Sequence, residues 1–469
     1  MTSAVVVGSG PNGLAAAIRL AQEGIAVTVL EGYDRPGGGT RTSELTLPGV
    51  LHDDCAAFHP TGVISPFLAS LGLERHGLEW LWPEIDLAHP LDDGRAGVLS
   101  RDFDRTLDSL GSDATAWRKL FGPMTENLDD IVSEIFRPVV HVPAHPITLT
   151  RFGLRALMPA TWTARRFKDD PARALYMGVA AHAFGKLTTP LSGSVGLMLS
   201  AAGHKAGWPV AKGGTQSITN AMISELEALG GVVKTGVTVT SLHELGAPDI
   251  VMLDTAPDAV VRIVGDRLPG RVRRQLTRYT YGPAVHKVDF AIDGDVPWTN
   301  ADARVAGTLH LNGKAEEIVA AEAATARGEL PDRPFVLIGQ QYLADPSRSA
   351  GNINPLWAYA HVPHNYQGDA TEHVIGQIER FAPGFRDTIV ATSTRNAPEM
   401  AAYNPNYVGG DIGTGANTAK QIALRPRFAL NPYKLGVKGV YLCSSATPPG
   451  AGVHGMCGFN AAQTALAKL

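Results

Sequence analysis

The first part of the chain alternates short apolar runs with a stretch of helix-forming residues. Residues 4–7 are continuously apolar, as expected of a strand buried on both faces of a parallel sheet. Residues 14–22 are strong helix formers and stop just before Gly24, a residue typical of helix C-caps. Residues 26–30 form a second β-branched run that ends at Glu31. The pattern predicts a strand–turn–helix–strand unit.

Two later stretches repeat this α/β pattern. The first has a helical pattern that ends at Leu229, followed by strand-like runs at 232–242 and 250–253. The second has a strand at 439–443 and a helix over 454–469, with its N-terminus near Val453. Three separated segments, 1–75, 205–270 and 405–469, are therefore predicted to build one nucleotide-binding domain.

The segments between them have a different texture. Residues 76–204 carry most of the long helical patterns. Residues 271–404 contain strand-like runs at 287–292, 335–339 and 356–361. They also contain one clear helical pattern, at 372–381. These two segments are predicted to form a second, α+β domain that binds the substrate, which makes the fold class α/β with an interleaved second domain.

Composition excludes several classes of protein. The 469 residues are 44% hydrophobic and 18% charged, which suits more than one packed core. The 41 Lys and Arg nearly balance the 45 Asp and Glu, so no nucleic-acid partner is expected. Three cysteines favour a reducing cytoplasm, and no targeting signal stands at the start. No apolar run reaches the roughly 18 residues of a membrane span, and 178–208 is expected to form core helices.

The turn after the first predicted strand is rich in glycine. It reads Gly8-Ser9-Gly10-Pro11-Asn12-Gly13 and leads into the predicted helix. Gly8 permits a tight turn, Gly10 lets the backbone approach a pyrophosphate, and Gly13 lets the helix pack closely on the sheet. The helix N-terminus offers unpaired N–H groups to phosphates, and Glu31 is placed to accept ribose hydroxyls. This arrangement predicts a dinucleotide site.

A second glycine-rich loop follows the ribose acid directly. It contains Gly32, Arg35, Gly38, Gly39, Thr40 and Arg41. Backbone N–H groups and two guanidinium groups there can surround a diphosphate. A nicotinamide-only dehydrogenase has no reason to carry such a loop, so FAD is favoured over NAD. Here the chain resembles the flavin amine oxidase and phytoene desaturase superfamily, whose pattern is an acid, an arginine, paired glycines and a second arginine.

The run 439–462 extends this resemblance to the whole chain. Its Thr447-Pro448-Pro449-Gly450 and Val453-His454-Gly455-Met456 segments look most like the phytoene-dehydrogenase-related branch that includes the pyridine nucleotide-disulfide oxidoreductase domain 2 proteins. The resemblance implies an amine oxidase-like fold and a non-covalent FAD. It also implies cofactor contacts from Val239 and from the C-terminal run, at Ala446, Gly452, Val453 and His454. Relatives usually carry more chain between 242 and 249, so the adenine side is expected to be trimmed.

The residues that act on the substrate are harder to assign. Lys287 stands in a predicted strand, where amine oxidases place a lysine near flavin N5, but a solvated lysine at a strand end fits equally well. His454 is a candidate for proton relay near neutral pH, or else a helix-capping histidine. Weaker candidates are His59, Tyr281 and Tyr359. No metal site is expected, because the 15 histidines show no ligand spacing.

Three functions remain open at this point. The leading one is a FAD-dependent enzyme that desaturates, or isomerises, a carbon–carbon bond in an apolar, isoprenoid-like small molecule. The second is a flavin amine oxidase that uses O2, and the third is a non-catalytic flavin-bound scaffold. The electron acceptor, whether O2, a quinone or another molecule, stays open. So do the oligomeric state, a homodimer included, and a peripheral contact with a membrane.

Overall fold

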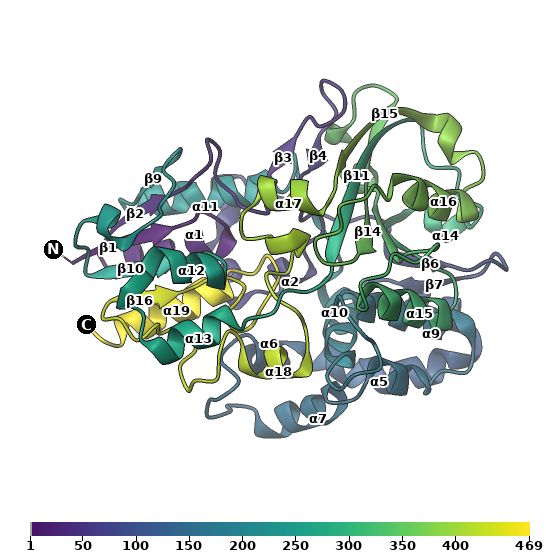
Figure 1. The fold of residues 1–469 in the computed structure, drawn as a ribbon. Coiled ribbons are helices and arrows are strands. Elements are labelled where there is room, and N and C mark those ends of the chain that lie inside the picture. Colours follow the sequence, from purple (N-terminus) through teal and green to yellow (C-terminus); the bar gives the residue numbers. More distant parts are fainter. Residues whose placement is uncertain (1) are drawn as a thin grey trace.

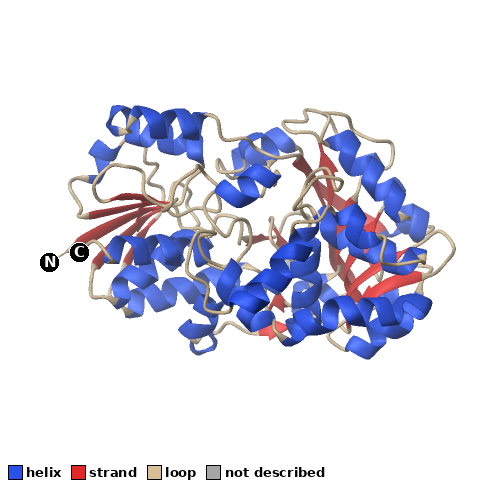
Figure 2. Ribbon diagram, turned by 90° about the horizontal axis from the view of Figure 1, so that it is seen from below, coloured by secondary structure: helices blue, strands red, loops and turns tan. Residues whose placement is uncertain are grey.

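The computed structural model describes residues 2–469 and contains two large sheets joined by helices and loops (Figures 1 and 2). The five-stranded sheet has the order β16-β10-β1-β2-β9, and all of its strand pairs are parallel. Its strands are β1 (Ser3–Val7), β2 (Ala26–Leu30), β9 (Val232–Lys234), β10 (Ile250–Leu253) and β16 (Val440–Leu442). The apolar runs of the sequence thus become parallel strands, fully buried in β10 and β16 and largely exposed in the edge strand β9, and the α/β prediction is confirmed.

Helices cover both faces of this sheet. One face packs against α1 (Pro11–Gln22), α11 (Gln216–Ala228) and α19 (Met456–Leu466), and the other packs against α12 (Pro257–Val264) and α13 (Gly270–Thr277). Counted from β9, the strands lie in the sequence order third, second, first, fourth, fifth. The order reverses between β1 and β10, and open α/β sheets bind ligands at such a point, beyond the carboxyl ends of the strands.

The second sheet has seven strands in the order β15-β11-β14-β13-β12-β6-β7. Only the pair of β12 and β6 is parallel. Its strands are β6 (Ile85–Pro90), β7 (Ala96–Leu99), β11 (Ala284–Asp293), β12 (Ala306–Leu311), β13 (Val336–Gly339), β14 (Ile353–Val362) and β15 (Ile389–Arg395). One face packs against α16 (Thr371–Phe381) in an apolar core.

The register of this sheet decides which side chains face the first sheet. Thr308 on β12 pairs with Gly339 on β13, which pairs with Trp357 on β14. Two residues along, Leu337 on β13 lies between His310 and Tyr359. Because side chains alternate along a strand, these residues share the face opposite α16.

In Figure 1 the helical region lies below the seven-stranded sheet, at the lower centre and right. Helices α9 (Asp170–Ala181) and α10 (Gly193–Ala206) are largely buried, so the apolar stretch of the sequence forms core helices. No helix within residues 2–469 is both long enough and apolar enough to cross a bilayer. The other helices are α2 (Pro60–Val63), α3 (Pro66–Leu71), α4 (Phe103–Leu110), α5 (Ala114–Glu126), α6 (Leu128–Ile135), α7 (Pro146–Ala156), α8 (Ala160–Ala164), α14 (Ala301–Arg304), α15 (Ala315–Thr325), α17 (Ala397–Tyr403) and α18 (Ala419–Leu424).

Two predicted elements differ from the structure. The strand expected at 232–242 is only β9, because Gly236 turns the chain with a φ of 70° and the next residues are exposed. The last helix begins at Met456 rather than near Val453, because Gly455 at its N-cap has a φ of 69°. Two small pairs of strands complete the fold, β3 (Thr42–Ser43) with β4 (His52–Asp53), and β5 (Trp80–Leu81) with β8 (Val210–Ala211).

The strands divide between the two sheets by segment. Every strand of the parallel sheet lies within 1–75, 205–270 or 405–469, and every strand of the seven-stranded sheet lies within 76–204 or 271–404. The division of the whole chain into two domains at these boundaries stays a prediction.

One buried cation joins the parts of the molecule. The Arg348 guanidinium is fully buried and binds the carboxylates of Asp53 on β4 and Asp345. It also donates to the carbonyl of Ala211 on β8, at 2.7 Å. Asp53 in turn accepts from the backbone N–H of Thr215, at 2.8 Å. This network ties the loop after β2 to the seven-stranded sheet and to the start of α11.

Replacing Arg348 with Met is expected to lower the free energy of unfolding by about 3–5 kcal/mol, because two buried carboxylates lose their cation. Chemical denaturation followed by fluorescence measures the change. The matched control is Arg262→Met, which removes an exposed pair with Asp258 on α12 and is expected to cost less than about 1 kcal/mol. Equal effects of the two substitutions would contradict a structural role for the buried network.

Candidate functional site

A single cavity of about 1030 Å³ connects the two sheets. At one end it is lined by the loops that follow β1, β2 and β10, where the strand order reverses. At the other end it reaches Thr308, Leu337, Trp357 and Tyr359 on the seven-stranded sheet. The cavity is therefore long enough to run from the dinucleotide loops to the face opposite α16.

The first glycine turn forms one wall of the cavity as predicted from its sequence. Gly8 has a φ of 101°, and a Cβ there would lie 2.8 Å from the carbonyl oxygen of Asp254. Helix α1 begins at Pro11, and Gly10 at its N-cap has no side chain to cap it. Pro11 has no N–H and that of Gly13 is bonded to the Asp254 carboxylate, so the N–H of Asn12 and the positive end of the helix dipole are left to serve an anion at this wall.

Glu31 lies at the carboxyl end of β2 in the same wall, nearly buried. Its carboxylate accepts from the backbone N–H of Ser9 and of Tyr33, each at 3.0 Å. The Arg41 guanidinium lies 3.5 Å away. The acid is thus fixed at the cavity wall, where a ribose would meet it.

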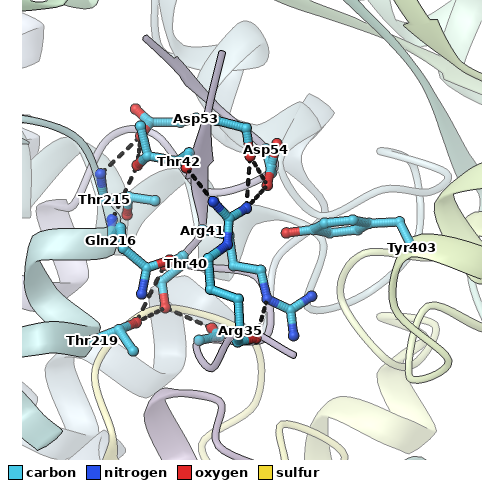
Figure 3. Close-up of polar contacts among 12 residues, drawn as sticks. Arg35, Thr40, Arg41, Thr42, Asp53, Asp54, Thr215, Gln216, Thr219 and Tyr403 are labelled. Carbon is cyan, nitrogen blue, oxygen red and sulfur yellow. Dashed lines mark hydrogen bonds and ion pairs between the residues drawn. The ribbon is translucent and has the colours of Figure 1, made fainter. Parts of the chain in front are cut away.

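Figure 3 shows how the second glycine loop is held. The Thr40 hydroxyl lies 2.7 Å from that of Thr219 on α11. The Arg41 Nε donates to the carbonyl of Arg35 at 3.1 Å, and its guanidinium lies 5.5 Å from the centre of the Tyr403 ring. Arg35 itself binds the carbonyl of Thr42 and the carboxylate of Asp54. Arg41 therefore lines the cavity, whereas Arg35 braces the loop from behind.

The C-terminal run closes another part of the wall. Gly452, Val453 and His454 line the cavity. Burial lowers the pKa of His454 to about 4, and its Nδ1 accepts from the backbone N–H of Met456 at 3.0 Å. The imidazole is therefore neutral near pH 7 and holds the first turn of α19.

Most predicted cofactor contacts come together at this end of the cavity. Those that line it are Gly8, Gly10, Pro11, Asn12, Glu31, Gly32, Gly38, Gly39, Thr40, Arg41, Val239, Gly452, Val453 and His454. Three lie behind the wall, namely Gly13, Arg35 and Ala446. Gly13 has a supporting role, because its N–H donates to Asp254 at 2.9 Å and a Cβ there would clash with the carbonyl of Gly8.

Lys287 is fully buried and does not line the cavity. It forms an ion pair with Asp289, two residues along β11. Its Nζ lies 5.1 Å from the centre of the Trp357 ring, and that ring does line the cavity. Lys287 thus stands one layer behind the wall. Among the weaker candidates, Tyr359 lines the cavity, whereas His59 and Tyr281 do not.

Besides Tyr359, the far end of the cavity contains residues that the sequence pattern did not indicate. The Trp357 and Tyr359 rings meet at 78°, with centroids 4.9 Å apart. Thr308 Oγ1 and Trp357 Nε1 are buried and have no hydrogen-bond partner within residues 2–469. The other lining residues there are mostly apolar and include Phe58, Phe152, Phe184, Leu191, Val195, Met198, Leu199 and Trp208.

A histidine pair adds a polar point to this end. His182, which follows α9 and lines the cavity, lies 2.9 Å from His310 on β12, Nε2 to Nε2. Burial lowers the pKa of His182 to about 3, so it is neutral at physiological pH. His361 binds the buried carboxylate of Glu322 nearby at 2.7 Å. No group of three or more His, Cys, Asp or Glu side chains within residues 2–469 is placed to hold a metal ion.

Asp254 is a second acid at the dinucleotide end. It follows β10, lines the cavity and accepts from the N–H of Gly13. Burial raises its pKa from 3.8 to about 7, and the charge of Glu31 adds to the rise, whereas the Gly13 hydrogen bond opposes it. At neutral pH this carboxyl therefore carries its proton about half of the time.

Asp254→Asn is expected to change how stability depends on pH. Between pH 4 and 7 the folded protein holds a proton that the unfolded chain has released, so the wild type loses stability as pH rises through this window. Asn keeps the bond from Gly13 but cannot titrate. From pH 5 to pH 7 the variant should gain about 2 kcal/mol relative to the wild type. Chemical denaturation at both pH values measures this, and a constant difference between the proteins would contradict it.

A family model and several known proteins are similar to this chain in sequence. Residues 6–71 match the model of the NAD(P)-binding Rossmann-like domain. Mouse pyridine nucleotide-disulfide oxidoreductase domain-containing protein 2 is 23% identical over 99% of this chain and 93% of its own. A limonene dehydrogenase chain of Castellaniella defragrans is 29% identical, but over only 25% of this chain and 22% of its own.

Solved structures share the fold over the whole chain. An oxidoreductase of Methanosarcina mazei has a TM-score of 0.66 at 16% identity and covers 99% of this chain and 100% of its own. A putrescine oxidase variant has a TM-score of 0.63 at 19% identity and covers 100% of this chain and 99% of its own. The chain thus has a Rossmann-like dinucleotide-binding domain within an amine oxidase-like fold, and it is homologous over nearly its whole length to pyridine nucleotide-disulfide oxidoreductase domain-containing protein 2.

Proposed function

We propose that this protein is a FAD-dependent oxidoreductase that desaturates, or isomerises, a carbon–carbon bond in an apolar small molecule. The observation that carries the proposal is the continuous cavity, whose one end is built for a dinucleotide and whose other end is mostly apolar. One relative is named for an oxidoreductase domain, and another is named as part of a limonene dehydrogenase.

The residues at the dinucleotide end fit FAD, the cofactor that the fold implies. Glu31 would take the ribose hydroxyls, the α1 N-terminus and Arg41 would hold the diphosphate, and Val239 would contact the adenine side. Asn12 Oδ1 in this wall is buried without a hydrogen-bond partner within residues 2–469, which leaves it free for a bound molecule. When bound, FAD supplies a two-electron acceptor for hydride.

The far end of the cavity supports an apolar substrate over a cationic amine. Trp357 and Tyr359 meet nearly edge to face, so they do not form the two facing walls of a cage around an amine. His182 is neutral, and β12, β13 and β14 bring no carboxylate to this end. Apart from the two acids at the dinucleotide end, two carboxylates from elsewhere line the cavity, but Glu134 is bonded to His141 and to the N–H of His145, and Asp411 accepts three backbone N–H groups. The unpartnered groups of Thr308 and Trp357 can orient a substrate through hydrogen bonds. An amine oxidase remains the second candidate because of the shared fold.

Glu31→Gln should weaken FAD binding by roughly 10- to 150-fold, because charge-assisted hydrogen bonds of about 1.5–3 kcal/mol are weakened. Flavin fluorescence after dilution measures the released fraction. The control is Asp34→Asn, an exposed acid in the same loop that makes no ion pair within residues 2–469.

Acid precipitation of the wild type should release all flavin, since the cofactor is proposed to be non-covalent. Colour in the pellet, or equal retention by both variants, would argue against these assignments.

The substrate class is tested first. Anaerobic bleaching of the flavin by apolar alkenes, and not by primary amines, is expected. A flavin that no compound reduces would favour the non-catalytic scaffold.

A second experiment tests Lys287. If the protein is an oxidase, Lys287→Met should slow reoxidation of photoreduced flavin by O2, because the ammonium stabilises negative charge that develops on oxygen. Lys287→Met with Asp289→Asn serves as a control without a lone buried charge. Reoxidation rates equal to the wild type in both variants would remove Lys287 from the site.

A further inference from the structure

Large apolar side chains are exposed around one end of the cavity. Eight of them lie between residues 139 and 162, namely Val139, Val140, Val142, Ile147, Leu154, Leu157, Met158 and Trp162. Three more, Leu424, Phe428 and Leu430, follow from the end of α18. Val142 is 90% exposed and Leu430 is 82% exposed. We call residues 137–168 and 424–430 together the mouth patch.

The two segments of the mouth patch lie at the same opening. Arg137, Val139 and Phe152 line the cavity, and so does Arg425 from the other segment. Val139 is also 60% exposed, so the cavity reaches the surface there. In Figure 1, α7 and α18 both lie along the lower edge of the molecule. The exposed apolar groups therefore surround the entrance to the cavity.

Helix α7 is apolar on two sides. Phe152 and Ala156 are buried against the cavity, whereas Ile147 and Leu154 point outward and are exposed by more than half. A helix that faces only water usually carries polar residues on its outer side. An apolar outer face with interspersed Arg is typical of helices that lie in the surface of a membrane.

The mouth patch is also strongly basic. Between 137 and 168 the chain has no Asp or Glu and six basic residues, Arg137, Arg151, Arg155, Arg165, Arg166 and Lys168, although the whole chain has a net charge of −4. None of the six forms an ion pair with another of the described residues 2–469, whereas the exposed Arg95 and Arg118 each do. These cations are therefore available to an anionic partner.

We propose that the mouth patch docks the protein on the surface of an anionic lipid bilayer. Apolar side chains would enter the region between headgroups and acyl chains, and the basic residues would contact the headgroups. A second copy of this chain fits less well, because a two-fold interface would bring the same unpaired cations together. Docking would let an apolar substrate enter the cavity from the bilayer, and this last step alone rests on the proposed function.

The purified protein is tested by sedimentation with vesicles of phosphatidylcholine alone and of phosphatidylcholine mixed with phosphatidylglycerol. Binding is expected to the mixed vesicles and to weaken as salt is raised. Arg151→Gln with Arg155→Gln should lower vesicle affinity on the order of tenfold or more. Ile147→Ser with Trp162→Ser should lower it by at least as much.

Matched controls lie outside the mouth patch. Lys234→Gln with Arg267→Gln removes two other exposed cations, and Val232→Ser with Val390→Ser removes two exposed apolar side chains. These variants should bind vesicles like the wild type. The proposal is overturned if the wild type does not bind mixed vesicles at low salt, or if the controls lose as much affinity as the mouth-patch variants. It is also overturned if the mouth-patch changes leave vesicle binding intact and instead abolish self-association in sedimentation velocity. The sedimentation experiment does not measure flavin bleaching, so its result is independent of the test of the proposed function.

Discussion

The buried guanidinium of Arg348 sets the geometry on which the cavity depends. Asp53, its partner, also accepts from the Thr42 hydroxyl, at 2.9 Å, directly after the second glycine loop. One cation therefore fixes the loop that would hold a diphosphate relative to the seven-stranded sheet. Breaking these ion pairs would leave unpaired charges in the protein interior, which costs free energy. The glycine loop and the seven-stranded sheet are therefore held in a fixed relative position.

The two ends of the cavity differ in polarity and therefore suit different ligands. Its dinucleotide end has backbone N–H groups, fixed carboxylates and Arg41, which suit a polar, charged ligand. Its far end is dominated by aromatic and aliphatic side chains with a few unpaired polar groups, which suits a ligand that leaves water readily. Under the proposed function, a reacting bond and a cofactor ring would meet between these two ends.

The dinucleotide end could be predicted from sequence because its chemistry is local. Gly8, Gly10 and Glu31 act through turn geometry and their position after strands, and both can be seen as spacing. The sequence also predicts cofactor contacts from Gly13, Arg35 and Ala446, yet these residues line no part of the cavity, because spacing does not distinguish a wall from the layer behind it.

The far end could not be found in this way. Trp357, Thr308 and His182 come together only through the register of the seven-stranded sheet and the packing of α9. Asp254 gave no signal, because a single acid after a strand is common. The mouth patch depends on which side of α7 faces water, and periodicity alone does not show this when both sides are apolar.

The parallel sheet is assembled from distant parts of the chain, and this fixes an order of events during synthesis. Strand β16 is the edge strand of this sheet and pairs with β10. Helix α19 packs so closely on α1 that a Cβ at Gly458 would overlap the carbonyl of Asn12. A ribosome releases β1 and α1 long before β16 and α19. Domains fold as units once their parts have emerged, so this sheet is complete only when translation is nearly finished. Until then, the edge of β10 that pairs with β16 presents unpaired backbone N–H and C=O groups, the kind of edge along which chains aggregate.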